Sequence, residues 1–165
     1  AELAPISIAR RLVRAPSGRT TPGLRHAECL AMMRLGAPTV SPERLQLGRI
    51  AMFANGDEAA LDRFLSHDRL GRRLADGWHV RLRFLRRYGQ IAALPDLPPR
   101  AGTAESDEPV VAVTVARLSL PELPRFLRWG KSVERLVAGH PGATFATAAI
   151  RPPRTFATFS VWRSV

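Results

Sequence analysis

Residues 141–162 read PGATFATAAIRPPRTFATFSVW, and this stretch decides the fold. Runs of alternating residues stand on either side of a Pro-Pro pair, which is typical of two β-strands joined by a turn. A similar arrangement occurs earlier, where PGLRHAECLAMMRL at 22–35 leads through a proline-containing connection to RIAMFA at 49–54. Two copies of one supersecondary unit indicate an internal repeat, so we expect two related units of strands and helices.

A helix with one apolar side is predicted directly after the second of the early strands. Asp57 stands at the N-cap position and Glu58 in the first turn, where a carboxylate favours the helix dipole. Apolar residues then recur at helical spacing as far as Gly77, namely Leu61, Phe64, Leu65 and Leu74. We expect this helix to lie on a sheet with Phe64 buried.

Residues 78–84 alternate apolar and polar side chains, which predicts a further strand. Its apolar side carries Trp78, Val80, Leu82 and Phe84. Its polar side carries His79, Arg81 and Arg83. If the apolar side packs under the helix, the polar side must face away from that helix.

The second half of the chain repeats the pattern of strand and helix. Residues 110–118 are almost wholly apolar and rich in valine, which predicts a strand near the centre of a sheet. Ser119 and Glu122 have the capping-box spacing, although Pro124 is tolerated only in a first turn and the helix could begin there instead. One side of this helix is apolar, with Leu123, Phe126, Leu127, Val133, Leu136 and Val137, and Phe126 is expected to be buried.

These elements predict an α+β protein built from ferredoxin-like units in tandem, with antiparallel sheets that carry helices on one face. Residues 1–89 form a diverged unit, residues 90–108 a Pro-rich acidic linker, and residues 109–165 a second unit of order β-α-β-β. The second unit stops before the second helix and last strand of the pattern. It is therefore expected to be truncated or completed by a partner, with the strand near residue 160 at an edge.

The composition excludes several kinds of site but does not identify a function. The 165 residues are 45% hydrophobic, with a net charge of +11 and a single cysteine, Cys29. That cysteine is expected to be a small buried hydrophobe, and a disulfide within the chain or a zinc site built on several thiolates is excluded. No apolar run is long enough to span a bilayer and no signal peptide is visible, so a cytoplasmic protein is expected.

The basic charge permits binding to phosphate backbones, but little else supports nucleic-acid binding. The sequence has no low-complexity basic run, no aromatic RNA-binding signature and no helix-turn-helix pattern. It also lacks a Gly-rich phosphate loop, a Ser-His-Asp set, a paired-carboxylate site and metal-ligand spacing. Hydrolase, kinase and Rossmann functions therefore have no support.

Residues 109–163 resemble the spheroidene monooxygenase group and, more loosely, the antibiotic-biosynthesis monooxygenases. The resemblance rests on LPRFLRWG at 123–130, HPG at 140–142 and FATFSVWRS at 156–164. Residues 22–89 look like a diverged second copy of the same unit. The resemblance implies the dimeric α/β-barrel superfamily, in which the sheet faces without helices meet around a pocket. It also implies oxidation of a flat apolar small molecule, with self-association or a pseudo-dimer, and with heme or without a cofactor.

In such a pocket, His79 is the candidate catalytic residue, as a general base or a heme ligand, with Arg81 and Arg83 as ligand-binding residues. The alternative is a solvent-facing polar side of an edge strand. His140 is a second candidate heme ligand, or else a cap at the end of the preceding helix. Asn55, which precedes a glycine at a strand end, is either catalytic or a turn residue. His26 and His67 are expected at the surface.

Four residues of the last strand share one face and form a second candidate site, namely Phe156, Thr158, Ser160 and Trp162. This mixed stripe could line a cavity for a flat apolar substrate, and the alternative is aromatic core packing. The sequence therefore favours a small-molecule-binding α/β-barrel protein, with monooxygenase chemistry implied by the resemblance alone. The alternative is a non-catalytic module, either a ligand-binding protein or a basic domain that binds a partner or nucleic acid.

Overall fold

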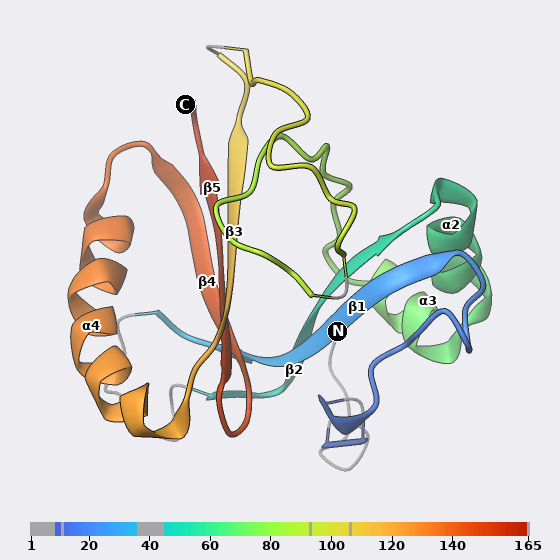
Figure 1. The fold of residues 1–165 in the computed structure, drawn as a ribbon, viewed down its shortest axis with the longest axis horizontal. Helices are drawn as coiled ribbons and strands as arrows, with labels where there is room; N and C mark the ends of the chain where they lie inside the picture. The colour runs from blue at the N-terminus through green and yellow to red at the C-terminus, as the bar shows by residue number, and fades with distance from the viewer. Residues whose placement is uncertain (1–8, 11, 36–44, 93, 106, 165) are drawn as a thin grey trace. The chain divides into compact units, whose positions relative to one another are not determined.

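The computed structural model describes residues 9, 10, 12–35, 45–92, 94–105 and 107–164 (Figure 1). Over these residues the chain is α+β, with one antiparallel sheet of strand order β2-β1-β4-β5-β3. The strands are β1 (Leu24–Met33), β2 (Leu45–Gly56), β3 (Val110–Arg117), β4 (Ala143–Arg151) and β5 (Thr155–Trp162). The helices are α2 (Glu58–His67), α3 (Arg69–Ala75) and α4 (Leu123–Gly139), with a 3₁₀ turn, η2, at Leu120–Glu122.

The chain divides into two compact units. The first consists of Ala1–Cys29 and Ala51–Thr103, and the second of Leu30–Ile50 and Ala104–Val165. The two early strands, the helix that follows them, the second helix and the last two strands are confirmed as elements of the expected type. Tandem ferredoxin-like repeats stay a prediction. None of the described helices is long and apolar enough to cross a membrane.

In unit 1 the predicted helix is confirmed at its start and wrong at its end. It begins after Asp57, but it stops at His67, and a second helix starts at Arg69. The reason is Asp68, whose carboxylate accepts the backbone N–H groups of Leu70 at 2.7 Å and Gly71 at 3.2 Å. Asp68 is therefore the N-cap of a new helix, even though the apolar spacing continues past it.

The core of unit 1 forms where this helix pair meets the start of β1. Phe64 is only 2% exposed, as predicted, and Leu70 is equally buried. Gly23 has a φ of +89°, and a Cβ at this position would lie 2.7 Å from the Cβ of Ala60. A glycine is therefore required both for the turn and for the close approach of the chain to α2.

The strand predicted at 78–84 is wrong. This segment carries no helix or strand, and Trp78 is 71% exposed while Val80 and Leu82 are also exposed. Alternation predicts a strand only where a neighbouring strand can pair with it, and no described strand of unit 1 does so here. The segment is instead held to α2 by Arg81, as shown below.

Unit 2 contains the predicted order β3, α4, β4, β5. β5 lies between β4 and β3 and is antiparallel to both, so β3 and β4 run parallel with β5 between them. Two expectations are therefore wrong, because β3 is an edge strand of the described sheet and β5, near residue 160, is an interior one. The apolar composition of β3 indicated burial, but composition does not determine strand order.

Helix α4 lies beside β4 (Figure 1). Ser119 makes no side-chain cap hydrogen bond, so the capping box is wrong, and the alternative start is confirmed with Pro124 in the first turn. No residue of α4 is buried. Phe126, expected to be buried, is half-buried, with its ring centroid 5.2 Å from that of Phe156 on β5.

Cys29 is fully buried, as predicted.

Candidate ligand pocket between helix α4 and the sheet

The stripe predicted on the last strand faces helix α4. Phe156 contacts Phe126 of this helix, and the indole of Trp162 lies edge-on to His140, the C-cap residue of α4, at 5.1 Å between ring centroids. Thr158 and Ser160 lie between these two aromatic contacts on the same side of β5, because side chains alternate along a strand. The four residues are therefore brought together, as the sequence indicated.

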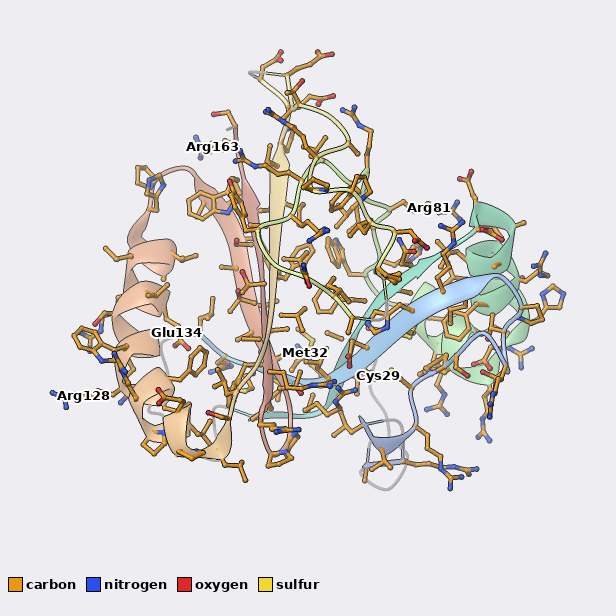
Figure 2. All side chains as sticks on the ribbon, viewed as in Figure 1. Cys29, Met32, Arg81, Arg128, Glu134 and Arg163 are labelled. Atoms are coloured by element: carbon orange, nitrogen blue, oxygen red, sulfur yellow. The ribbon has the colours of Figure 1, made fainter. Side chains whose placement is uncertain are left out.

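A small pocket opens where the two short side chains of this stripe face the helix. Its volume is about 60 Å³. Figure 2 shows Glu134 on the side of α4 that faces the sheet. The lining residues come from α4, β4, β5 and the end of β1, namely Leu35, Val133, Glu134, Val137, Ala146, Thr147, Thr158, Phe159 and Ser160. We call this the α4 pocket.

The α4 pocket joins polar groups to apolar walls. The polar residues of its lining are Glu134, Thr147, Thr158 and Ser160. The indole N–H of Trp162 donates to Oγ of Ser160 at 2.9 Å, so the hydroxyl hydrogen of Ser160 remains available as a donor. Thr147 donates to the carbonyl of Met33 at 3.5 Å. The lining thus combines a hydroxyl donor, Ser160, with an acidic residue, Glu134.

The size of the α4 pocket limits what it can hold. Sites for drug-sized ligands measure roughly 300–1,000 Å³. The α4 pocket, at about 60 Å³, has room for the polar end of a ligand but not for a whole flat molecule. It has no histidine in its lining, and the described residues contain no group of three or more metal-ligating side chains. Its residues do not fit a heme.

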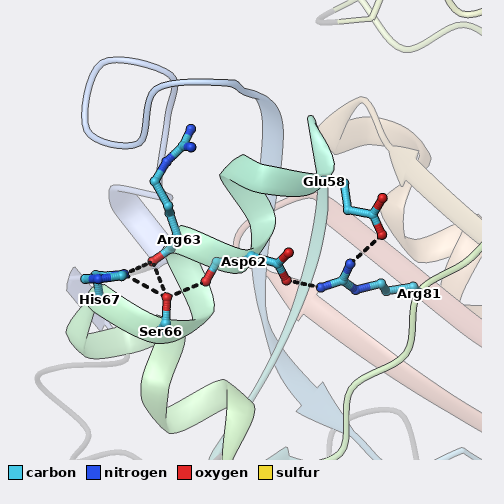
Figure 3. A network of polar contacts seen from close by, with 6 residues as sticks. All are labelled: Glu58, Asp62, Arg63, Ser66, His67 and Arg81. Carbon is cyan, nitrogen blue, oxygen red and sulfur yellow. Dashed lines mark hydrogen bonds and ion pairs between the residues drawn. The ribbon is translucent and has the colours of Figure 1, made fainter.

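The other predicted ligand-binding residues lie in unit 1. Arg81 donates to Glu58 Oε1 at 2.7 Å and to Asp62 Oδ1, and both carboxylates belong to α2 (Figure 3). The hydrogen bond and charge of Asp62, with a smaller effect of Glu58, raise the pKa of Arg81 above its ordinary value. Arg81 therefore ties the segment at 78–84 to the helix. Arg83 is exposed in the same segment.

The candidate catalytic residues are not gathered around a cavity of the described residues. His79 is exposed, with Nδ1 3.3 Å from the carbonyl of Gly77. Asn55 is half-buried near the end of β2. His140 is the C-cap residue of α4, with its backbone N–H donating to the carbonyl of Val137, and its Nδ1 accepts the backbone N–H of Gly142 at 3.0 Å.

Two features of the structure are not among the residues predicted from the sequence. Glu134 was not singled out, although a glutamate between Val133 and Val137 interrupts the apolar side of α4 and is a signal for a polar site. His26 was expected at the surface, which is wrong, since its side chain is only 22% exposed and lies 3.8 Å from Glu28, which is 11% exposed. Positions i and i+2 of a strand share a face, so this pair could have been found.

His67 is exposed, as expected, at the end of α2 (Figure 3). Its Nδ1 lies 2.7 Å from Oγ of Ser66, which in turn donates to the carbonyl of Asp62 at 2.6 Å. Because that hydroxyl already bonds the backbone one turn back, the pair closes the helix end and is no nucleophile with its base.

Comparison with known proteins adds no relative: no family model, no curated protein and no solved structure matches the chain.

Proposed function

We propose that the chain is a small-molecule-binding α+β protein whose ligand is flat and mainly apolar and places a polar end in the α4 pocket. The observation that supports this is that Glu134, Thr158 and Ser160 line a hollow between a helix and a sheet. Such interfaces are usually close-packed and apolar. Polar side chains in this position are able to bind the polar end of a ligand in addition to the contacts they already make.

The chemistry of the lining defines the class of ligand. Ser160 can donate a hydrogen bond and a carboxylate such as Glu134 can accept several, so a hydroxyl on the ligand suits both residues. Val133 and Val137 form apolar walls beside these groups, which suits an apolar body next to the polar end. The proposed ligand is a flat apolar molecule with a hydroxyl group at one end.

Monooxygenase-type oxidation is the reaction class that the sequence resemblance implies, and we retain it as part of the proposal. In this scheme the pocket residues bind and orient the substrate. Heme has no assigned role here, because the α4 pocket does not fit it. The non-catalytic version of the proposal is ligand binding alone, and oxygen consumption with a bound hydroxylated substrate separates the two versions.

Binding of paired probes tests the site. Two flat apolar probes that differ only in one hydroxyl are titrated by calorimetry. Ser160→Ala and Glu134→Gln are each expected to weaken the hydroxylated probe about tenfold and to leave the other unchanged, as the loss of one hydrogen bond predicts. The matched controls are Ser132→Ala on α4 and Glu122→Gln before it, both exposed. Unchanged affinity of the hydroxylated probe for both Ser160→Ala and Glu134→Gln would remove the α4 pocket as the site.

A second candidate function is binding to an anionic partner. Helix α3 exposes Arg69, Arg72 and Arg73 at spacings i, i+3 and i+4 on one side, in a chain of net charge +11. Binding to mixed-sequence nucleic acid that falls steeply with salt, and that is weakened by Arg72→Ala with Arg73→Ala, would favour this function. Binding independent of salt would exclude it.

A further inference from the structure

The sequence of β3 does not suit the position of β3 in the sheet. VVAVTVAR is apolar on both faces, which is typical of a strand buried on both sides. However, Ala112, Val113, Thr114 and Val115 are all exposed, with Val113 at 41% and Val115 at 43%. β5 pairs with β3 along its whole length, and no described strand lies on its other side. We call that other side the β3 edge.

The β3 edge is an available template for strand pairing. In an antiparallel ladder, the N–H and C=O groups of alternate residues point away from the paired neighbour, so β3 presents a row of them on the side away from β5. Natural edge strands usually carry a lysine, a proline or a bulge that blocks such pairing. The only charge in β3 is Arg117 at its end, and its pairing with β5 runs without a register shift.

We propose that the β3 edge pairs with the same edge of a second copy, antiparallel and centred on Val113. A two-fold axis perpendicular to the sheet then sets Val113 opposite Val113 of the second copy, and Val111 opposite Val115 of the second copy. β-Branched cross-strand pairs of this kind stabilise a sheet. The strand is self-complementary in this register because its three valines at spacing two fall on one face in both copies.

The charged residues at the strand ends and the position of Pro109 favour this antiparallel register. Glu108 precedes the strand and Arg117 ends it, so antiparallel pairing places an acidic residue at the same end as the arginine of the second copy, one position from the residue opposite it, whereas parallel pairing would bring like charges to the same end. Pro109, which has no N–H, falls opposite Arg117 of the second copy, outside the uncharged stretch 110–116. A register shifted by one step and centred on Thr114 would set Arg117 against Val111 instead.

Sedimentation velocity of the whole chain over a range of concentrations tests the proposal. The wild-type chain is expected to dimerise reversibly. Val113→Lys and Val113→Asp should each weaken the dimer about tenfold or more, because like charges then face each other at the centre. An equimolar mixture of the two variants should dimerise again, since the register pairs Lys with Asp. The control, Leu136→Lys, makes the same change at an exposed residue of α4 and should leave the dimer intact.

Hydrogen exchange of the wild-type chain provides a test that needs no variant. Amides on the β3 edge should exchange rapidly at low concentration and become protected as the dimer forms. A chain that is monomeric at every concentration overturns the proposal, as does a dimer that survives Val113→Lys. A mixture of the two variants that stays monomeric overturns the Val113-centred register. Protection of the β3 edge in a monomer would mean that another segment occupies it, which also overturns the proposal.

Discussion

Helices α2 and α4 both carry an apolar side, yet only α2 has buried residues on that side. α2 buries Ala60 and Phe64 completely or nearly so in unit 1. α4, although longer, buries no residue in unit 2 and leaves a hollow beneath it. Helical spacing therefore predicts which side of a helix faces inward, but not how closely that side packs.

The residues that receive each helix explain the difference. Glycines allow close approach in unit 1: a Cβ on Gly23 would lie 2.7 Å from Ala60, and a Cβ on Gly71 would lie 1.8 Å from the carbonyl oxygen of Phe64. Under α4, Phe156 and Trp162 meet the helix near its two ends, while the short Thr158 and Ser160 lie between them. Two large rings hold the helix above two small side chains, and the space between is the α4 pocket.

The largest effect expected from this comparison is at the two phenylalanines. Phe64→Ala should lower the free energy of unfolding by about 3–5 kcal/mol, because it opens a cavity in a closed core. Phe126→Ala should cost about 1–2 kcal/mol, since a half-buried ring loses less contact. Urea unfolding of both variants measures the difference. Equal losses at the two sites would mean that α4 packs as closely as α2.

Two glycine substitutions are expected to act in opposite directions. Gly71→Ala should cost about 1–3 kcal/mol, because its Cβ would collide with the backbone of α2. Gly130→Ala lies within α4 with nothing inside 4 Å of the added Cβ, and should stabilise the chain by roughly 0.5–1 kcal/mol through helix propensity. Thermal unfolding of both variants gives the signs. A destabilising Gly130→Ala would contradict the open surroundings of α4.

Local pattern predicted most of the elements because alternation and helical spacing are local properties. It failed where the outcome depends on distant residues. The segment at 78–84 alternates as a strand does, but no described strand pairs with it, and its Arg81 binds Glu58 and Asp62 of α2 instead. β3 has the composition of a central strand and lies at an edge of the described sheet. The shared face of Thr158 and Ser160 followed from period two, whereas Glu134 comes from a helix whose placement the sequence does not determine.

Filling the α4 pocket should have a smaller effect. Ala146→Val adds two methyl groups where the wall of the hollow has space, and is expected to raise stability by about 0.5–1 kcal/mol while reducing binding of the hydroxylated probe. Ala149→Val, the matched control on the same strand, enters a buried position and should instead cost about 1–3 kcal/mol. Urea unfolding with probe titration separates these outcomes. Equal destabilisation by both variants would argue against a hollow beneath α4.

The smallest effect is expected at Arg81, which bridges the segment at 78–84 to α2. Because Arg81 and its two carboxylate partners are exposed, Arg81→Ala should lower the urea midpoint slightly at low salt and not at high salt. The raised pKa of Arg81 adds stability that is complete below the ordinary arginine value and is lost only as the pH rises through the folded value. Titration of Arg81 should therefore leave stability constant through the neutral range. Arg128→Ala, at an exposed position of α4, is the control and should be insensitive to salt. An Arg81→Ala loss that persists in high salt would mean that the side chain acts by packing and not by charge.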